Sequence, residues 1–162
     1  MSSATRWLYP LCISILLMMP LGQSALAREC VAVITAGTGH HFWRAIESGS
    51  LQAGNELGVD IFFRVLYDET SVDAQEQILR EALEKQCIGV VLAPNSSAHR
   101  KTLDLFRQKN LPIVLIDRSM ALGTVYAQVM TNNYRAGQRA AREMVARLRG
   151  EGSVTVLRLK PG

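Results

Sequence analysis

The chain has little of several features that would mark a specialised class of protein. Its 162 residues include only three cysteines, aromatic residues make up 6%, and the formal net charge is +4. So few cysteines exclude a disulfide-dense miniprotein, and a hydrophobic fraction of 48% excludes a disordered or collagen-like chain. The arginines of segment 135–149 are spread along a predicted helix and do not form a block, so we expect no nucleic-acid partner.

Catalytic motifs are also missing. No serine lies in a nucleophile-elbow pattern, and neither Cys30 nor Cys87 has an evident histidine partner. The acidic residues Asp68, Glu69 and Asp117 form no recognisable pair of carboxylates. We therefore expect a protein that is not an enzyme and has no catalytic residue.

Sites for a metal or a nucleotide are incomplete in the same way. The motif Gly37-Thr38-Gly39 lacks the third glycine of a dinucleotide fingerprint, because Phe42 stands in its place, and no Walker lysine follows. His40 and His41 are adjacent, so they cannot share a helix face as metal ligands do. We expect no cofactor and no metal, a tight turn at the glycines, and a polar ligand contact for His40.

The first 27 residues have the pattern of a signal peptide. Arg6 supplies a positive start, residues 8–21 form an apolar run, and Ala25-Leu26-Ala27 provides small residues for cleavage after Ala27. A membrane anchor is the alternative, but the run is shorter than the roughly 20 residues a span requires and contains proline. The sequence thus predicts export to the periplasm.

From residue 28 on, short apolar runs alternate with amphipathic segments. The runs predict strands at 31–34, 59–65, 88–93, 113–116, 125–129 and 154–159. Helices are predicted between the first two strands, with Phe42, Ile46, Gly49, Ala53 and Leu57 on one face, and over about 71–86, 97–109 and 132–149. This alternation predicts an α/β fold, a doubly wound parallel sheet with helices on both faces. Ligands of such sheets bind beyond the carboxyl ends of the strands.

Two cysteines remain after the predicted cleavage. If the first and third strands are neighbours, pairing Val31 with Ile88 places Cys30 directly opposite Cys87. Adjacent strands lie about 4.8 Å apart, which is within the range of Cα separations in disulfides. Both a disulfide and a pair of buried free thiols fit the sequence.

The loops after the strands carry the candidate ligand residues. Trp43 lies off the apolar stripe of its helix, so we expect an exposed indole on which a sugar ring could stack, whereas Phe42 suits either packing or ligand contact. Asp117 and Arg118 directly follow a buried strand, and together they offer an acceptor and a planar donor to a polyol. A surface ion pair is the plainer interpretation of these two.

The combined motifs resemble those of a known family. They are His40-His41-Phe42-Trp43, Glu56-Leu57-Gly58, Gly89-Val90-Val91-Leu92-Ala93-Pro94, Leu111-Pro112-Ile113-Val114, Ile116-Asp117-Arg118 and Thr131-Asn132-Asn133. This pattern is similar to the type I periplasmic sugar-binding proteins, the ribose-binding-like receptors that share a fold with the ligand domains of LacI-type regulators.

The resemblance implies a two-lobed receptor for a sugar or related polyol, which passes its ligand to an ABC permease. A periplasmic module that signals to a sensor kinase is the alternative. The implied ligand residues are His40, Phe42, Trp43, Asp117, Arg118 and Asn132.

The resemblance also implies a division of the chain. Residues 28–130 correspond to the first lobe, and residues 131–162 to an incomplete start of the second, so a truncated copy is expected. The last predicted helix would then lack a partner for its apolar stripe, and we expect this stripe to be exposed and prone to association or proteolysis. The residues of the stripe are Tyr134, Ala141, Met144, Val145 and Leu148.

Overall fold

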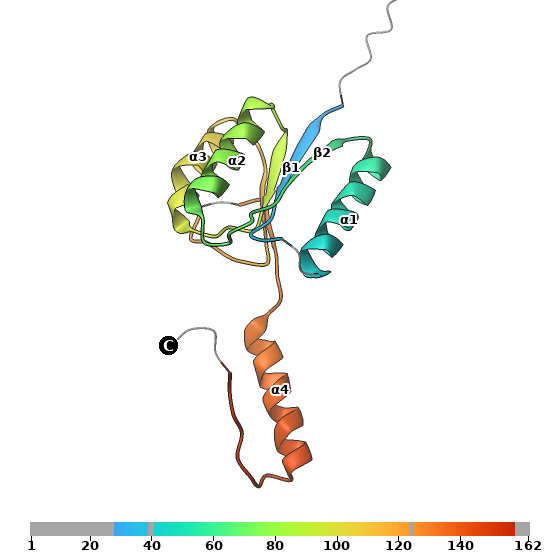
Figure 1. Ribbon diagram of the computed structural model, residues 1–162, viewed down its shortest axis with the longest axis vertical. Helices are drawn as coiled ribbons and strands as arrows, with labels where there is room; N and C mark the ends of the chain where they lie inside the picture. The colour runs from blue at the N-terminus through green and yellow to red at the C-terminus, as the bar shows by residue number, and fades with distance from the viewer. Residues whose placement is uncertain (1–27, 39–40, 124, 158–162) are drawn as a thin grey trace, which may run out of the picture.

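One five-stranded parallel sheet organises the molecule (Figure 1). The computed structural model describes residues 28–38, 41–123 and 125–157, and the predicted signal peptide lies outside them. The strand order is β2-β1-β3-β4-β5. The strands are β1 (Cys30–Ile34), β2 (Asp60–Arg64), β3 (Gly89–Leu92), β4 (Ile113–Ile116) and β5 (Ala127–Val129). The α/β fold predicted from the apolar runs is confirmed.

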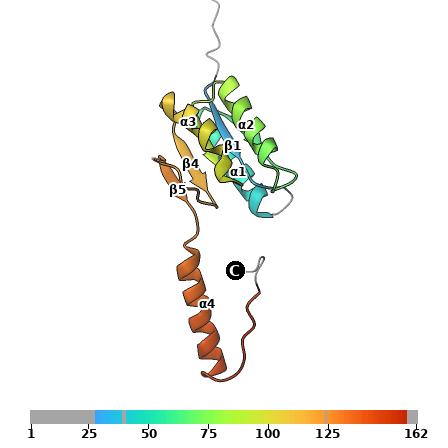
Figure 2. The ribbon, with the colours of Figure 1, turned by 90° about the vertical axis from the view of Figure 1, so that its left-hand side faces the viewer.

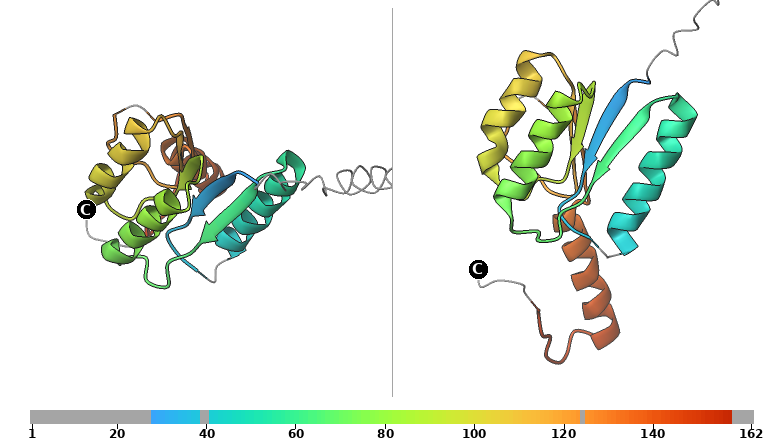
Figure 3. Two further views of the ribbon diagram at one scale, coloured as in Figure 1. Left: turned by 90° about the horizontal axis from the view of Figure 1, so that it is seen from above. Right: turned by 45° about the horizontal axis from the view of Figure 1, so that its top comes forward.

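Helices cover the two faces of the sheet unequally. Helix α1 (His41–Leu57) lies on one face, and α2 (Val72–Glu84) and α3 (Arg100–Gln108) lie together on the other, as Figures 1 and 3 show. A short 3₁₀ helix, η1 (Ser97–His99), leads into α3. Helix α1 ends where Gly58 adopts a φ of 71°, a left-handed conformation that glycine tolerates best.

The main hydrophobic core lies between the sheet and the pair α2 and α3. Leu79 and Ala82 of α2 and Leu103 and Phe106 of α3 are fully buried there. The strands contribute Ile34, Leu92 and Leu115, among others, which are also fully buried. The helices predicted over about 71–86 and 97–109 therefore form and cover this core.

A disulfide joins the starts of two neighbouring strands. The Sγ atoms of Cys30 and Cys87 are 2.07 Å apart, a bonded distance, and their Cα atoms are 4.3 Å apart. The neighbouring placement of β1 and β3 agrees with the prediction, but the predicted register is wrong by one residue. Val31 pairs with Gly89, not with Ile88. The backbone N–H of Ile88 donates to the carbonyl of Cys30 instead.

The segment after β5 extends away from the sheet. Helix α4 (Asn133–Leu148) projects from the edge where the strands end, as Figures 1 and 2 show, and none of its residues is buried. The strand predicted for 154–159 does not form in residues 154–157, and its last two residues lie outside those described. Within the described ranges, no helix has both the length and the apolar character that a membrane crossing needs.

Candidate functional site

Polar side chains from several loops gather where the strands end. Because all five strands are parallel, their carboxyl ends lie along one edge of the sheet. The loop after β2 carries Glu69, the loop after β3 carries Asn95, and Asp117 and Arg118 follow β4. We call Glu69, Asp117 and Arg118 the strand-end cluster.

Arg118 is the centre of the strand-end cluster. Its Nη2 donates to Oε2 of Glu69 at 2.7 Å, and its Nε lies 3.4 Å from Oδ2 of Asp117. Asp117 has a φ of 59°, and this left-handed turn redirects the chain directly after β4. The three side chains are 33 to 40% exposed, so they remain open to a ligand.

Sequence reasoning missed the role of Glu69. The sequence analysis considered Glu69 only as a possible member of a pair of carboxylates, whereas in the structure Glu69 pairs with Arg118, 49 residues further along the chain. Nothing local in the sequence identifies this contact, because it depends on which strands are neighbours.

The two aromatic residues differ in exposure, and Trp43 differs from the expectation. Trp43 is 5% exposed and packs with Ala36 and Ala93, so the predicted exposed indole is wrong. Phe42 is 52% exposed. The two rings meet edge to face, with centroids 4.8 Å apart. The apolar stripe on α1 faces an open groove, whereas Trp43 turns toward the ends of β1 and β3.

Trp43 nevertheless lies close to the strand-end cluster. A β-carbon placed on Gly37 would overlap Oε1 of Glu69 and would lie 2.9 Å from Nε1 of Trp43. The indole N–H and the Glu69 carboxylate therefore border the same small space beside Gly37. Glu69, which pairs with Arg118, thus lies near Trp43.

A buried hydrogen-bond network supports the loop that carries Glu69. Asn95 Nδ2 donates to the carbonyls of Glu69, at 3.1 Å, and Ser71, at 2.9 Å. Gln75, fully buried, donates to the carbonyl of Ala93 and accepts from the backbone N–H of Asn95, both at 2.9 Å. These bonds fix the loops after β2 and β3 against each other.

The network continues through a buried histidine. His99 is fully buried, its Nε2 lies 2.8 Å from Oδ1 of Asn95, and its Nδ1 lies 3.2 Å from Oε2 of Glu76. Thr102 donates to Oε1 of Glu76, and Arg80 pairs with the same oxygen. Burial raises the pKa of the Glu76 carboxyl, but the hydrogen bonds from Thr102 and His99 and the charge of Arg80 outweigh it, so this pKa lies below its usual value.

The remaining predicted ligand residues are placed differently. His40 lies outside the described residues. Asn132 is exposed and is the N-cap of α4, where its Oδ1 accepts from the backbone N–H of Arg135 at 3.0 Å. In the described part of the chain, no three His, Cys, Asp or Glu residues are grouped as a metal site would require.

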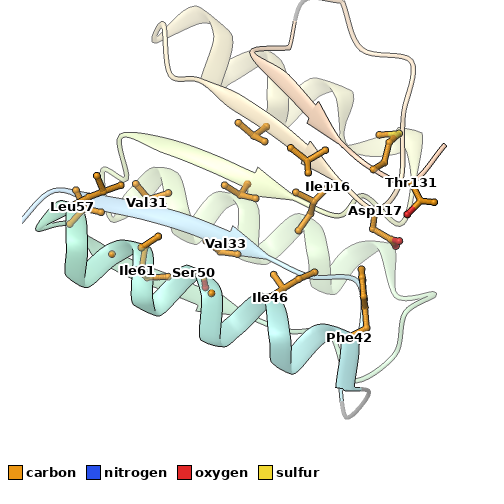
Figure 4. Close-up of a pocket in the computed structure, with 18 residues that line it drawn as sticks. Val31, Val33, Phe42, Ile46, Ser50, Leu57, Ile61, Ile116, Asp117 and Thr131 are labelled. Carbon is orange, nitrogen blue, oxygen red and sulfur yellow. The ribbon is translucent and has the colours of Figure 1, made fainter.

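An apolar groove of about 860 Å³ runs along the sheet face beside α1. Figure 4 shows Phe42, Ile46, Ser50 and Leu57 of α1 along one side, with Asp117 and Thr131 at one end. Since only α1 covers this face, the groove consists of sheet surface that no described helix fills. Its polar end at Asp117 connects the groove to the strand-end cluster.

Residues 31–162 match the family described as periplasmic binding protein domain. Curated relatives include the ribose import binding protein RbsB of Escherichia coli (strain K12), 21% identical over 84% of this chain. The D-apiose import binding protein of Actinobacillus succinogenes is 25% identical over 78%. The chain spans 45% and 41% of these two relatives, so it corresponds to less than half of each.

Solved structures show the same relationship. The periplasmic component of an ABC-type sugar transport system from Hahella chejuensis superimposes with a TM-score of 0.66 at 30% identity, over 74% of this chain and 44% of that one. A carbohydrate transporter solute-binding protein from Agrobacterium radiobacter, in complex with D-arabinose, gives a TM-score of 0.67 at 26% identity, over 77% and 42%.

Proposed function

Because this chain belongs to the periplasmic binding protein family, we propose that it forms the first lobe of a receptor that binds a sugar or related polyol for an ABC permease. The two-lobed receptor and its permease are part of the proposal, since the chain spans less than half of its curated relatives. The relatives import ribose and D-apiose according to their names, and the D-arabinose complex belongs to a similar fold. These similarities favour transport over the sensor-kinase alternative.

The observation that carries the proposal is the strand-end cluster beside Trp43. Arg118 can donate in a plane, and Asp117 and Glu69 can accept, so adjacent hydroxyl groups of a polyol would find both kinds of partner. The indole ring of Trp43 is buried, but its N–H borders the space beside Gly37 that Glu69 also borders.

The proposed function predicts weak but specific binding by the described lobe. A micromolar receptor has about 8 kcal/mol of binding free energy, and half of this corresponds to millimolar affinity. Titration with D-ribose, D-arabinose or D-glucose should shift the NMR resonance of the Trp43 indole N–H with a millimolar midpoint. Asp117→Asn should weaken the binding several-fold. Equal midpoints in the variant and the parent chain would place the site elsewhere.

We further propose that residues 1–27 direct export to the periplasm and are cleaved after Ala27. The description of the matching family and the periplasmic component from Hahella chejuensis support this destination. Sequencing the amino terminus of the exported protein checks the cleavage point, which we expect before Arg28. An intact amino terminus on the exported chain would contradict it.

A further inference from the structure

We propose that Glu69 contacts the ligand and sets the charge specificity of Arg118, so that the site takes uncharged polyols and rejects anionic sugars. The inference rests on the proposed sugar-binding function and deepens it. It concerns a residue that the motifs of the sequence did not identify.

The first observation is that Glu69 already forms an ion pair with the guanidinium group of Arg118, which a ligand would contact. Its Oε2 accepts from Nη2 of Arg118 at 2.7 Å, while Asp117 lies 3.4 Å from Nε. One cation thus faces two carboxylates, and the strand-end cluster has a net formal charge of −1. An incoming carboxylate or phosphate would meet two negative charges beside the single positive charge of Arg118, and both acids would repel it.

The second observation is that the loop backbone at Glu69 is held in place. Asn95 donates to the backbone carbonyl of Glu69, and the neighbouring Asp68 accepts from the backbone N–H and the hydroxyl of Thr70, at 2.8 and 2.6 Å. Gly37 leaves the room that Oε1 of Glu69 occupies, since a β-carbon there would overlap it. With this backbone held and its Oε2 paired with Arg118, the carboxylate of Glu69 is an ordered acceptor.

The third observation is that Glu69 remains accessible. Its side chain is 40% exposed, and that of Arg118 is 39% exposed. A polyol can therefore reach the second lone pairs of the carboxylate while the ion pair stays intact. Hydroxyl groups donate to carboxylates and accept from guanidinium, so a neutral polyol satisfies both partners without separating them.

The test compares D-glucose with D-glucuronate. Glucuronate carries a carboxylate where glucose carries a hydroxymethyl group. Binding to the chain and to Glu69→Gln is followed through the Trp43 indole resonance. Glu84→Gln removes the same charge from the opposite end of α2 and serves as the matched control. Circular dichroism checks that each variant is folded.

The parent chain and Glu84→Gln should prefer glucose. In Glu69→Gln, the ratio of glucuronate affinity to glucose affinity should rise roughly tenfold or more, since Arg118 becomes available for a charged hydrogen bond. A ratio that stays within about twofold of the parent value would overturn the inference while leaving the proposed function intact.

Inorganic sulfate separates the two proposals. If the parent chain binds none of the sugars, the proposed sugar-binding function fails, and the role of Glu69 is decided by sulfate alone. Sulfate should then shift the Trp43 resonance in Glu69→Gln. It should not shift this resonance in the parent chain or in the double variant that combines Glu69→Gln and Arg118→Gln. Equal responses of these three proteins would overturn the inference.

Discussion

At the scale of single residues, periodicity identified a shared helix face correctly but not what lies against it. Phe42, Ile46 and Leu57 do line one side of α1, as the sequence predicted, yet this side borders an open groove. Trp43, one position from the stripe, reaches the buried cluster with Ala36 and Ala93. The sequence could not distinguish these cases, because burial depends on the elements that cover a face and not on the spacing of its residues.

The different burial of the two rings predicts different costs of truncation. Trp43→Ala should lower the free energy of unfolding by about 3 to 5 kcal/mol, because it removes a buried aromatic side chain. Phe42→Ala should cost much less, since its ring is half exposed. Urea denaturation of the two variants measures both values. Similar losses in both would contradict the packing seen here.

The lowered pKa of Glu76 predicts a pH-dependent contribution to stability. A carboxyl group whose pKa is lower in the folded state stabilises the protein above its unfolded pKa, and this stabilisation is lost as the pH falls through the folded value. The difference in unfolding free energy between the parent chain and Glu76→Gln should therefore be largest near pH 6 and shrink toward pH 3. A difference that grows on acidification would contradict the network around His99.

At the scale of elements, a strand was predictable where the sequence marks both ends of an apolar run. The run 113–116 matches β4 at both ends. Residues 154–157 form no strand, and there a run of apolar residues has no adjacent strand with which to form hydrogen bonds. The contact between Glu69 and Arg118 belongs to this scale too, since it exists only because the order of strands brings their loops together.

The link between β1 and β3 predicts a large effect of reduction. A disulfide that closes a loop of 57 residues contributes about 4 kcal/mol in the chain-entropy treatment. The oxidised protein should therefore unfold at higher urea concentration than Cys30→Ser with Cys87→Ser. Thiol titration of the denatured, unreduced protein should find neither cysteine free, and two free thiols would rule the bridge out.

At the scale of the whole molecule, the described residues leave large apolar surfaces open to solvent. One is the groove beside α1, and another is the stripe of α4, where Tyr134 is 77% and Val145 59% exposed. The exposure of this stripe was predicted from the sequence. The groove was not, because its existence depends on which helices cover the sheet.

The stripe of α4 predicts concentration-dependent association. Met144→Lys with Val145→Lys should shift the protein toward the monomer in size-exclusion chromatography with light scattering, without lowering the urea midpoint of the sheet domain. Ala146→Lys, on the polar side of the same helix, is the control. Identical elution of both variants and the parent chain at about 100 μM would show that the stripe does not mediate association.

The Cys30–Cys87 disulfide closes the chain between these two residues into a covalent ring, and the rest of the chain lies outside this ring. Strand β1, helix α1, strand β2 and helix α2 all lie inside the ring that the bond closes. A single backbone cut anywhere inside this ring leaves both pieces on one molecule until a reductant is added. A cut between β5 and α4 is not bridged by this bond, so paired denaturing gels with and without reductant would distinguish a cut inside the ring from a cut outside it.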